Sequence, residues 1–304
     1  MSEMETKTQV QNLIIQESLL TCIDLANSDL HQSVLLLKQA CLDSGFLINH
    51  GISEEVMDKA FEKSKKFFAF PLEEKMKVLK NKKHRGYIPL YDQIPDPENQ
   101  VQGTCNQFLT SKKFVECSQI IRDTFFFILK GITKKVTTLD PKRICKAIAK
   151  LLALALDLDA DYFDSPEMLG KPISTLRLLH YEVLREIGSL KGNIWNGAHS
   201  DYKMMTLIAT DGVLGLQICK DRNAKPQKWE YVPSIEGYNM IMFNFRYTLI
   251  PFFLEPNHDC IIECLPTCQS ENNLPKFPAI KCWTHLTQRY EEVHSNFRSY
   301  EKHA

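Results

Sequence analysis

The residues with the clearest chemical meaning are His199 and Asp201, within the stretch AHSDYKMMTLIATD. Side chains at positions i and i+2 of a β-strand point to the same face, so this spacing would place an imidazole beside a carboxylate. A histidine and a carboxylate are two of the protein ligands in iron sites that leave positions open for oxygen and a cosubstrate. Because the triplet is short, a structural histidine–aspartate pair is the alternative interpretation.

A second pair with the same spacing is Arg246 and Thr248, in an apolar stretch that leads to Pro251. A guanidinium and a hydroxyl on one face of a strand can bind a carboxylate through directed hydrogen bonds. Tyr181, at the end of RLLHY, can supply another hydroxyl. The alternatives are a surface arginine and an ordinary core tyrosine, which are common in proteins.

The charge balance of the chain limits the classes of ligand. Its 304 residues carry 37 Lys and Arg against 37 Asp and Glu, so no excess charge would attract nucleic acid or an anionic membrane. The proportions of apolar residues, 44%, and charged residues, 24%, are typical of a globular protein. The amino-terminal residues lead into no signal-type apolar stretch. We therefore expect a cytoplasmic monomer that binds a small molecule.

The apolar pattern changes along the chain from helical to extended, which indicates an α+β fold. Helical periodicity ends near Gly45, resumes after Ser53 as far as Pro71, and returns from Pro141 to about Leu158. From Ile173 onward the sequence predicts short strands that form an antiparallel sandwich or barrel. These strands are STLRLLHYE, AHSDYKMMTLIATD, GLQICKD, WEYVP, YNMIMFNF, RYTLIPFFL and IIECLP.

Two segments of the first half are expected outside the core. Residues 72–83 are rich in lysine, which predicts a helical turn with a solvated face. Residues 88–112 contain several turn-forming prolines and aspartates without a clear period, which predicts a loop.

The cysteines allow a different class of protein to be considered. Cys260, Cys264 and Cys268 are spaced by four residues, which would suit a zinc site. A structural zinc site needs a fourth ligand, however, and Pro266 interrupts the helix that would align these three. A zinc protein is therefore the least favoured interpretation, and we expect the ten cysteines to be mostly core thiols.

Several motifs in order resemble one family, the Fe(II)- and 2-oxoglutarate-dependent dioxygenases of the isopenicillin N synthase-like type found in plants and fungi. The resemblance covers most of the chain. It is carried by ACLDSGFLINHGI, FFAFPLEEKMK, HRGY, RLLHYE, AHSDYKMMTLIATDGVLGLQI, KWEYVP, RYT before PFFLEP, and LTQRYEEVH.

This resemblance implies a site and a reaction. His199 and Asp201 would bind Fe(II), while Tyr181, Arg246 and Thr248 would hold the cosubstrate 2-oxoglutarate. The enzyme would hydroxylate or otherwise oxidise a small organic metabolite with release of succinate and CO2, and ascorbate would serve as the reductant. The resemblance would also place this reaction in plant secondary metabolism.

The resemblance also implies the organisation of the chain. Residues 1–140 would form a helix-rich amino-terminal domain with a divergent stretch at 101–145. Residues 141–304 would form a double-stranded β-helix, or jelly roll, with its core at about 173–268, flanking helices and a carboxy-terminal helix.

The chain departs from the family pattern between Asn244 and Arg246, where the strands that would carry a third iron ligand, a histidine, are missing. Lys203 also stands where a glycine is usual, and Arg-x-Thr lies one residue farther from Pro251 than expected. The jelly roll is therefore predicted to be incomplete. The competing hypothesis is an inactive remnant, or a splice or gene-model variant, of such an enzyme.

His258 is a possible replacement for the missing iron ligand. It follows the Arg-x-Thr strand within the turn EPNHD, whereas the family histidine precedes that strand. We therefore expect His258 to be a solvated turn residue.

Overall fold

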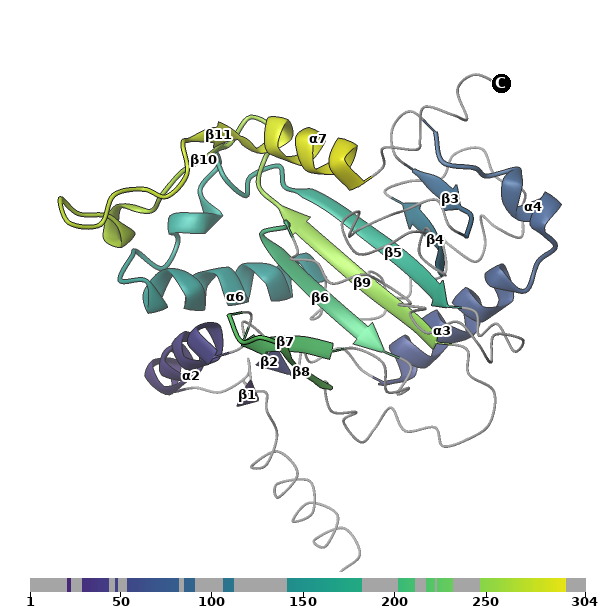
Figure 1. The fold of residues 1–304 in the computed structure, drawn as a ribbon, viewed down its shortest axis with the longest axis horizontal. Coiled ribbons are helices and arrows are strands. Elements are labelled where there is room, and N and C mark those ends of the chain that lie inside the picture. Colours follow the sequence, from purple (N-terminus) through teal and green to yellow (C-terminus); the bar gives the residue numbers. More distant parts are fainter. Residues whose placement is uncertain are drawn as a thin grey trace, which may run out of the picture.

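The computed structural model describes residues 21–22, 29–43, 47–48, 54–81, 85–90, 106–111, 141–181, 202–210, 217–221, 223–231 and 247–293. At its centre is a five-stranded sheet in the order β3-β4-β5-β9-β6, in which every neighbouring pair is antiparallel (Figure 1). The strands are β3 (Gly86–Ile88), β4 (Asn106–Ser111), β5 (Ile173–Tyr181), β6 (Met205–Thr210) and β9 (Tyr247–Glu255).

The helices lie around this sheet, with α2 and α6 near β6 and with α3 and α4 at the other side of the view (Figure 1). They are α2 (Leu30–Asp43), α3 (Glu54–Phe68), α4 (Leu72–Met76), α6 (Pro141–Ala155) and α7 (Cys282–Val293), with 3-10 turns η1 (Tyr162–Asp164) and η2 (Pro266–Cys268). Pro141 begins α6 because the first helical position needs no backbone N–H donor. Among the described residues, no helix is long and apolar enough to cross a membrane.

One face of the central sheet is covered by helices, and we call it the helix face. Leu176 and Leu178 of β5 and Ile250 of β9 pack there against Phe67 and Phe68 of α3. Toward β6, the same face is covered by α6, whose Ala149 and Ala153 share a cluster with Met205 and Leu254. These contacts bury the apolar side of both helices, which is the main source of their stability.

The other face of the sheet, which we call the opposite face, carries the alternate residues of the same strands. Leu179 and Tyr181 of β5 contact Leu249 of β9 on this face. Alternation along β5 places Arg177 there as well.

Three small sheets complete the described structure. Parallel β1 (Thr21–Cys22) and β2 (Leu47–Ile48) form one pair. Antiparallel β7 (Gln217–Asp221) and β8 (Lys228–Tyr231) form the second, and antiparallel β10 (Ile261–Ile262) and β11 (Ile280–Lys281) form the third.

The α+β composition predicted from the sequence is confirmed, including α3 before Pro71, α6 from Pro141, and most of the later strands. The predicted loop at 88–112 is wrong in part, because residues 106–111 form β4 and pair with β5 along their whole length. The expected strand YNMIMFNF and most of the divergent stretch 101–145 lie outside the described residues.

The solvated face predicted for residues 72–83 is also wrong in part. Lys75 and Lys80 are each only 7% exposed. The Lys75 ammonium donates a hydrogen bond to the carbonyl oxygen of Phe68 at 3.2 Å, close to the end of α3. A cation suits the carboxyl end of a helix, so this lysine contributes to the fold instead of facing solvent.

Candidate active site

The candidate site residues fall into two groups. His199, Asp201 and Arg246 lie outside the described residues, so their common face and their distances stay predictions. Tyr181 and Thr248 are described, on the neighbouring strands β5 and β9.

Tyr181 ends β5 on the opposite face of the sheet. It is 4% exposed and packs with Leu179 and Leu249. A hydroxyl held in an apolar setting makes stronger hydrogen bonds than one in water, because the local dielectric is low. Tyr181 is therefore suitably placed to bind a polar group of a ligand on this face.

Thr248 occupies the helix face instead. It is fully buried and pairs in register with His180, whose ring stacks on Phe68 at 5.0 Å between centroids. Because antiparallel partners share a face and residues alternate along a strand, Thr248 and Tyr181 point to opposite sides of the sheet. The structure does not bring these two hydroxyls together, and their shared role in binding 2-oxoglutarate stays a prediction that this register does not support.

Arg177 is a basic residue on the same face as Tyr181 that the sequence analysis did not select. Its guanidinium lies over the ring of Phe253 with 5.3 Å to the centroid. An arginine stacked on an aromatic ring directs its N–H donors outward in the plane of the guanidinium. The signal that could have found Arg177 is its spacing of four residues from Tyr181 in RLLHY, since both must then share a strand face.

The residues that directly follow Asp201 are firmly packed. Lys203 forms an ion pair with Glu255 at the end of β9, and the two side chains are 15% and 3% exposed. The Lys203 ammonium also lies 4.5 Å from the centroid of the Tyr202 ring. The sequence indicated only that Lys203 is unusual at its position and gave no sign of its partner.

The comparisons with known proteins decide the family. Residues 20–119 match the family model described as the non-haem dioxygenase in morphine synthesis N-terminal domain. Kihadalactone A synthase LFS from Citrus sinensis is 37% identical over 319 aligned residues, covering 90% of this chain and 92% of that protein. Azadirone synthase LFS from Melia azedarach is 33% identical, with the same shares of the two chains covered. This chain belongs to the 2-oxoglutarate- and Fe(II)-dependent dioxygenases.

Solved structures show the fold of this dioxygenase. A full-length Neurospora crassa protein in complex with alpha-KG superposes with a TM-score of 0.68 at 22% identity, covering 89% of this chain and 95% of that chain. JOX2, in complex with 2OG, Fe and JA, gives a TM-score of 0.66 at 20% identity, covering 88% and 85%. Both belong to a family with a jelly-roll fold, and the antiparallel sheets and helices of this dioxygenase agree with it. That its core is incomplete stays a prediction.

The residues of this dioxygenase fit its expected metal and cosubstrate only in part. An imidazole and a carboxylate from His199 and Asp201 are donors that suit Fe(II), and the Tyr181 hydroxyl suits a carboxylate ligand. Across the described part of the chain, no three His, Cys, Asp or Glu side chains form a group that could hold a metal ion.

His258 lies in the turn after β9. It is exposed, and its ring lies 4.8 Å from that of Trp283 on α7, between centroids. These contacts agree with the turn position expected from the sequence.

Burial perturbs a thiol next to the Lys203–Glu255 pair. Burial, followed by the charge of Glu255 and then Cys260, raises the pKa of Cys282 from 9.0 to about 12, while Lys203 acts in the opposite direction. Cys282 is 1% exposed and its thiol donates weakly to the carbonyl oxygen of Pro256 at 3.7 Å. It is therefore a core thiol and not a reactive one.

Proposed function

We propose that this dioxygenase oxidises a small organic metabolite by hydroxylation or a related reaction, with conversion of 2-oxoglutarate to succinate and CO2. The observation that carries the proposal is the 37% identity to kihadalactone A synthase LFS across nearly the whole of both chains. The opposite face of the sheet, with Tyr181 among apolar neighbours, supports it.

The proposed roles of the residues follow from their chemistry. His199 and Asp201 bind the metal through an imidazole and a carboxylate. Tyr181 donates a hydrogen bond to a carboxylate of 2-oxoglutarate, and Arg246 pairs with that carboxylate through its guanidinium. A hydrogen bond from Thr248 to 2-oxoglutarate belongs to the same proposal. The position of Thr248 on the helix face argues against this contact.

Iron, when bound, activates dioxygen for the coupled oxidation of the cosubstrate and the substrate. The chain's own contribution is to orient these molecules and to exclude water. Leu179 and Leu249 beside Tyr181 provide an apolar wall for this purpose.

The names of the relatives suggest which substrates the proposed reaction would use. Two relatives are named as the synthases of kihadalactone A and azadirone, so the plant secondary metabolites that are converted into these two products are the first substrates to test. We also propose ascorbate as the reductant, a monomeric and cytoplasmic protein, and the division into residues 1–140 and 141–304.

The proposal is tested by incubating the purified full chain with Fe(II), 2-oxoglutarate, ascorbate and oxygen and measuring succinate. Asp201→Ala should abolish succinate release, because it removes one of two candidate metal ligands. Arg246→Ala should weaken 2-oxoglutarate binding by about 2–5 kcal/mol, the range for removing one partner of a buried charge pair.

Arg143→Ala is the matched control for the arginine variant. Arg143 is exposed on α6, so its loss should leave both succinate release and 2-oxoglutarate binding unchanged. Measurable succinate release by the parent that is matched by Asp201→Ala would exclude the proposed site.

A second candidate is an inactive remnant of such an enzyme, and one observation favours it. The alignment with the Citrus sinensis protein extends over 319 positions, more than the 304 residues of this chain, so this chain lacks positions that its relative has. This agrees with the deletion expected between Asn244 and Arg246. Absence of succinate release under every condition above would favour this candidate.

A further inference from the structure

The opposite face of the sheet keeps more contact with solvent along its middle than the helix face does. Leu178 of β5 is fully buried on the helix face, whereas its neighbour Arg177 on the opposite face is only half-buried. Leu254 and Phe253 of β9 differ in the same way. The middle of the opposite face therefore has the partial exposure that a surface for a bound small molecule needs.

Three neighbouring strands contribute side chains around Arg177 (Figure 1). Thr175 of β5 pairs in register with Phe253 of β9, which in turn pairs with Thr206 of β6. Because antiparallel partners share a face and residues alternate along a strand, these three residues lie on the opposite face with Arg177. We call Thr175, Arg177, Thr206 and Phe253 the arginine patch. It combines one guanidinium, one aromatic ring and two hydroxyls.

Phe253 restrains the guanidinium of the arginine patch. The Arg177 guanidinium carbon lies 5.3 Å from the centroid of the Phe253 ring, and stacking of this kind fixes the plane in which the N–H donors point. A guanidinium carries five N–H donors, so it can hold a group of the protein and still donate to a ligand. The Lys203 ammonium lies 6.0 Å from the same ring but is paired with Glu255, so this neighbouring pair adds little net charge.

Arg177 is well separated from the position proposed for 2-oxoglutarate. It lies four residues before Tyr181 on the same strand face, which corresponds to about 13 Å. Leu179 lies between them and, with Leu249, forms apolar surface. A molecule lying along this face from Tyr181 would therefore meet a hydroxyl, then apolar side chains, then a guanidinium. This order suits 2-oxoglutarate at the Tyr181 end and a second, mostly apolar molecule toward Arg177.

We propose that Arg177 is a substrate-binding residue whose guanidinium donates hydrogen bonds to a carbonyl or carboxylate oxygen of an otherwise apolar substrate. The apolar part of that substrate packs against Leu179 and Phe253. The inference rests on the proposed function, because it places the substrate beside 2-oxoglutarate, and it adds the chemical class of the substrate. A site with a donor of this kind discriminates against molecules that lack the acceptor oxygen, because the donor then loses its partner.

The test uses three naphthalenes of similar shape that differ in their acceptor oxygens. The probes are 2-naphthoate, 2-acetylnaphthalene and 2-isopropylnaphthalene, which carry a carboxylate, a neutral carbonyl and no acceptor. Their binding to the full chain is measured by equilibrium dialysis in the presence of 2-oxoglutarate. Arg177→Met should weaken binding of the first two probes by roughly 10–100-fold, because a hydrogen bond from a charged donor is lost. Binding of 2-isopropylnaphthalene should stay within about twofold of the parent, because a methionine preserves the apolar contacts with Phe253.

Two further variants separate the role of the guanidinium from a general effect on the protein. Arg177→Lys keeps the charge without the planar set of donors, so its affinity for 2-naphthoate should fall between those of the parent and Arg177→Met. Arg143→Met is the matched control, since Arg143 is exposed on α6, which covers the helix face. This variant should bind all three probes as the parent does.

The outcomes distinguish this inference from the proposed function. Equal binding of 2-naphthoate and of 2-acetylnaphthalene by the parent and Arg177→Met would overturn the inference, as would a parent that binds none of the probes. A loss of 2-oxoglutarate affinity in Arg177→Met as large as the loss for the probes would also overturn it, because Arg177 would then bind the cosubstrate. Absence of succinate release from a parent that binds the probes through Arg177 would contradict the proposed function alone.

Discussion

Thr248 and Leu249 are adjacent, and the register of β9 decides which of them faces Tyr181. The pairing of Thr248 with His180 and of Leu249 with Leu179 gives Tyr181 an apolar neighbour. A shift of one residue would reverse this assignment, because side chains alternate with a period of two. The resemblance predicts Arg-x-Thr one residue nearer to Pro251, and a difference of one residue would be sufficient to move a predicted ligand residue to the other side of the sheet.

Cys282 allows a prediction about pH at the same scale. Its pKa is raised by burial from 9.0 to about 12, so the folded state favours the protonated thiol. The stabilisation that the protonated Cys282 thiol gives to the folded state is fully present below pH 9 and is lost as the pH rises toward 12. Relative to Cys282→Ala, the parent should lose about 1 kcal/mol of unfolding free energy for each pH unit above 9, as measured by urea denaturation.

The comparison with Cys282→Ala removes the effects of lysines and tyrosines that titrate in the same range, since both proteins contain them. A parent–Cys282→Ala difference that does not change between pH 8 and pH 10 would contradict the prediction.

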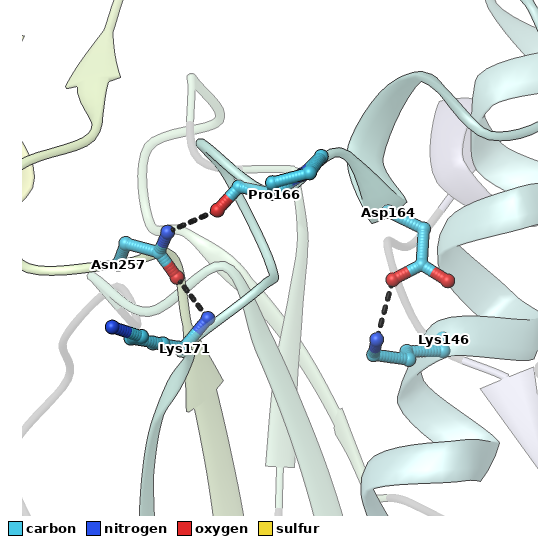
Figure 2. A network of polar contacts seen from close by, with 5 residues as sticks. All are labelled: Lys146, Asp164, Pro166, Lys171 and Asn257. Carbon is cyan, nitrogen blue, oxygen red and sulfur yellow. Dashed lines mark hydrogen bonds and ion pairs between the residues drawn. The ribbon is translucent and has the colours of Figure 1, made fainter.

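At the level of elements, Asn257, just after β9, forms hydrogen bonds with the turn before β5 (Figure 2). Its side-chain amide donates to the carbonyl oxygens of Pro166 at 2.7 Å and Glu167 at 2.9 Å. Its side-chain oxygen accepts a hydrogen bond from the backbone N–H of Lys171 at 2.6 Å. Gly170 allows this close packing, because a Cβ there would lie 2.4 Å from the Pro166 carbonyl oxygen.

Asn257→Ala should therefore lower the free energy of unfolding by about 1–3 kcal/mol, because it removes three hydrogen bonds of about 1 kcal/mol each that are partly open to water. Urea denaturation monitored by circular dichroism measures the change. Asn272→Ala is the control, since Asn272 is exposed in the loop between β10 and β11 and its loss should change stability little. Equal stability of the two variants would show that the turn is held by other contacts.

Helices and strands could be predicted from the sequence where the residues that determine them lie within the same segment. α3 and α6 were predicted because their apolar periodicity, the stop at Pro71 and the start at Pro141 lie within each segment. β4 was missed because its residues NQFLTS have little strand pattern of their own and are ordered by pairing with β5.

The candidate site was less predictable for the same reason. The residue types of Tyr181, Thr248 and Lys203 are visible in the sequence, but their faces and partners depend on pairing between distant strands. The burial of Lys75 and Lys80 is a similar case, because a lysine-rich segment gives no sign that the chain folds back over it. Side-chain chemistry was therefore predictable and side-chain direction was not.

At the scale of the whole molecule, the deletion that we predict before β9 determines how much activity we expect. An enzyme with two protein ligands for iron should bind it more weakly than one with three, and missing strands would leave sheet edges unpaired near the site. The chain is also shorter than its alignment with the Citrus sinensis relative, which supports a deletion. These two consequences can be separated by restoring the strands with and without their histidines.

We therefore predict the behaviour of a chimera in which residues 232–246 are replaced by the corresponding segment of the Citrus sinensis relative. With Fe(II), 2-oxoglutarate and ascorbate, the chimera should release succinate at least roughly 10–100-fold faster than the parent, since even the loss of an outer partner costs that much. The same chimera with the histidines of its graft changed to alanine should recover the paired strands but not the activity. If the alanine version were as active as the chimera, the gain would come from closure of the sheet and not from a third metal ligand. If the parent matched the chimera in succinate release, the proposed deletion would have no functional effect, and the parent would complete its metal site with a residue other than the missing histidine.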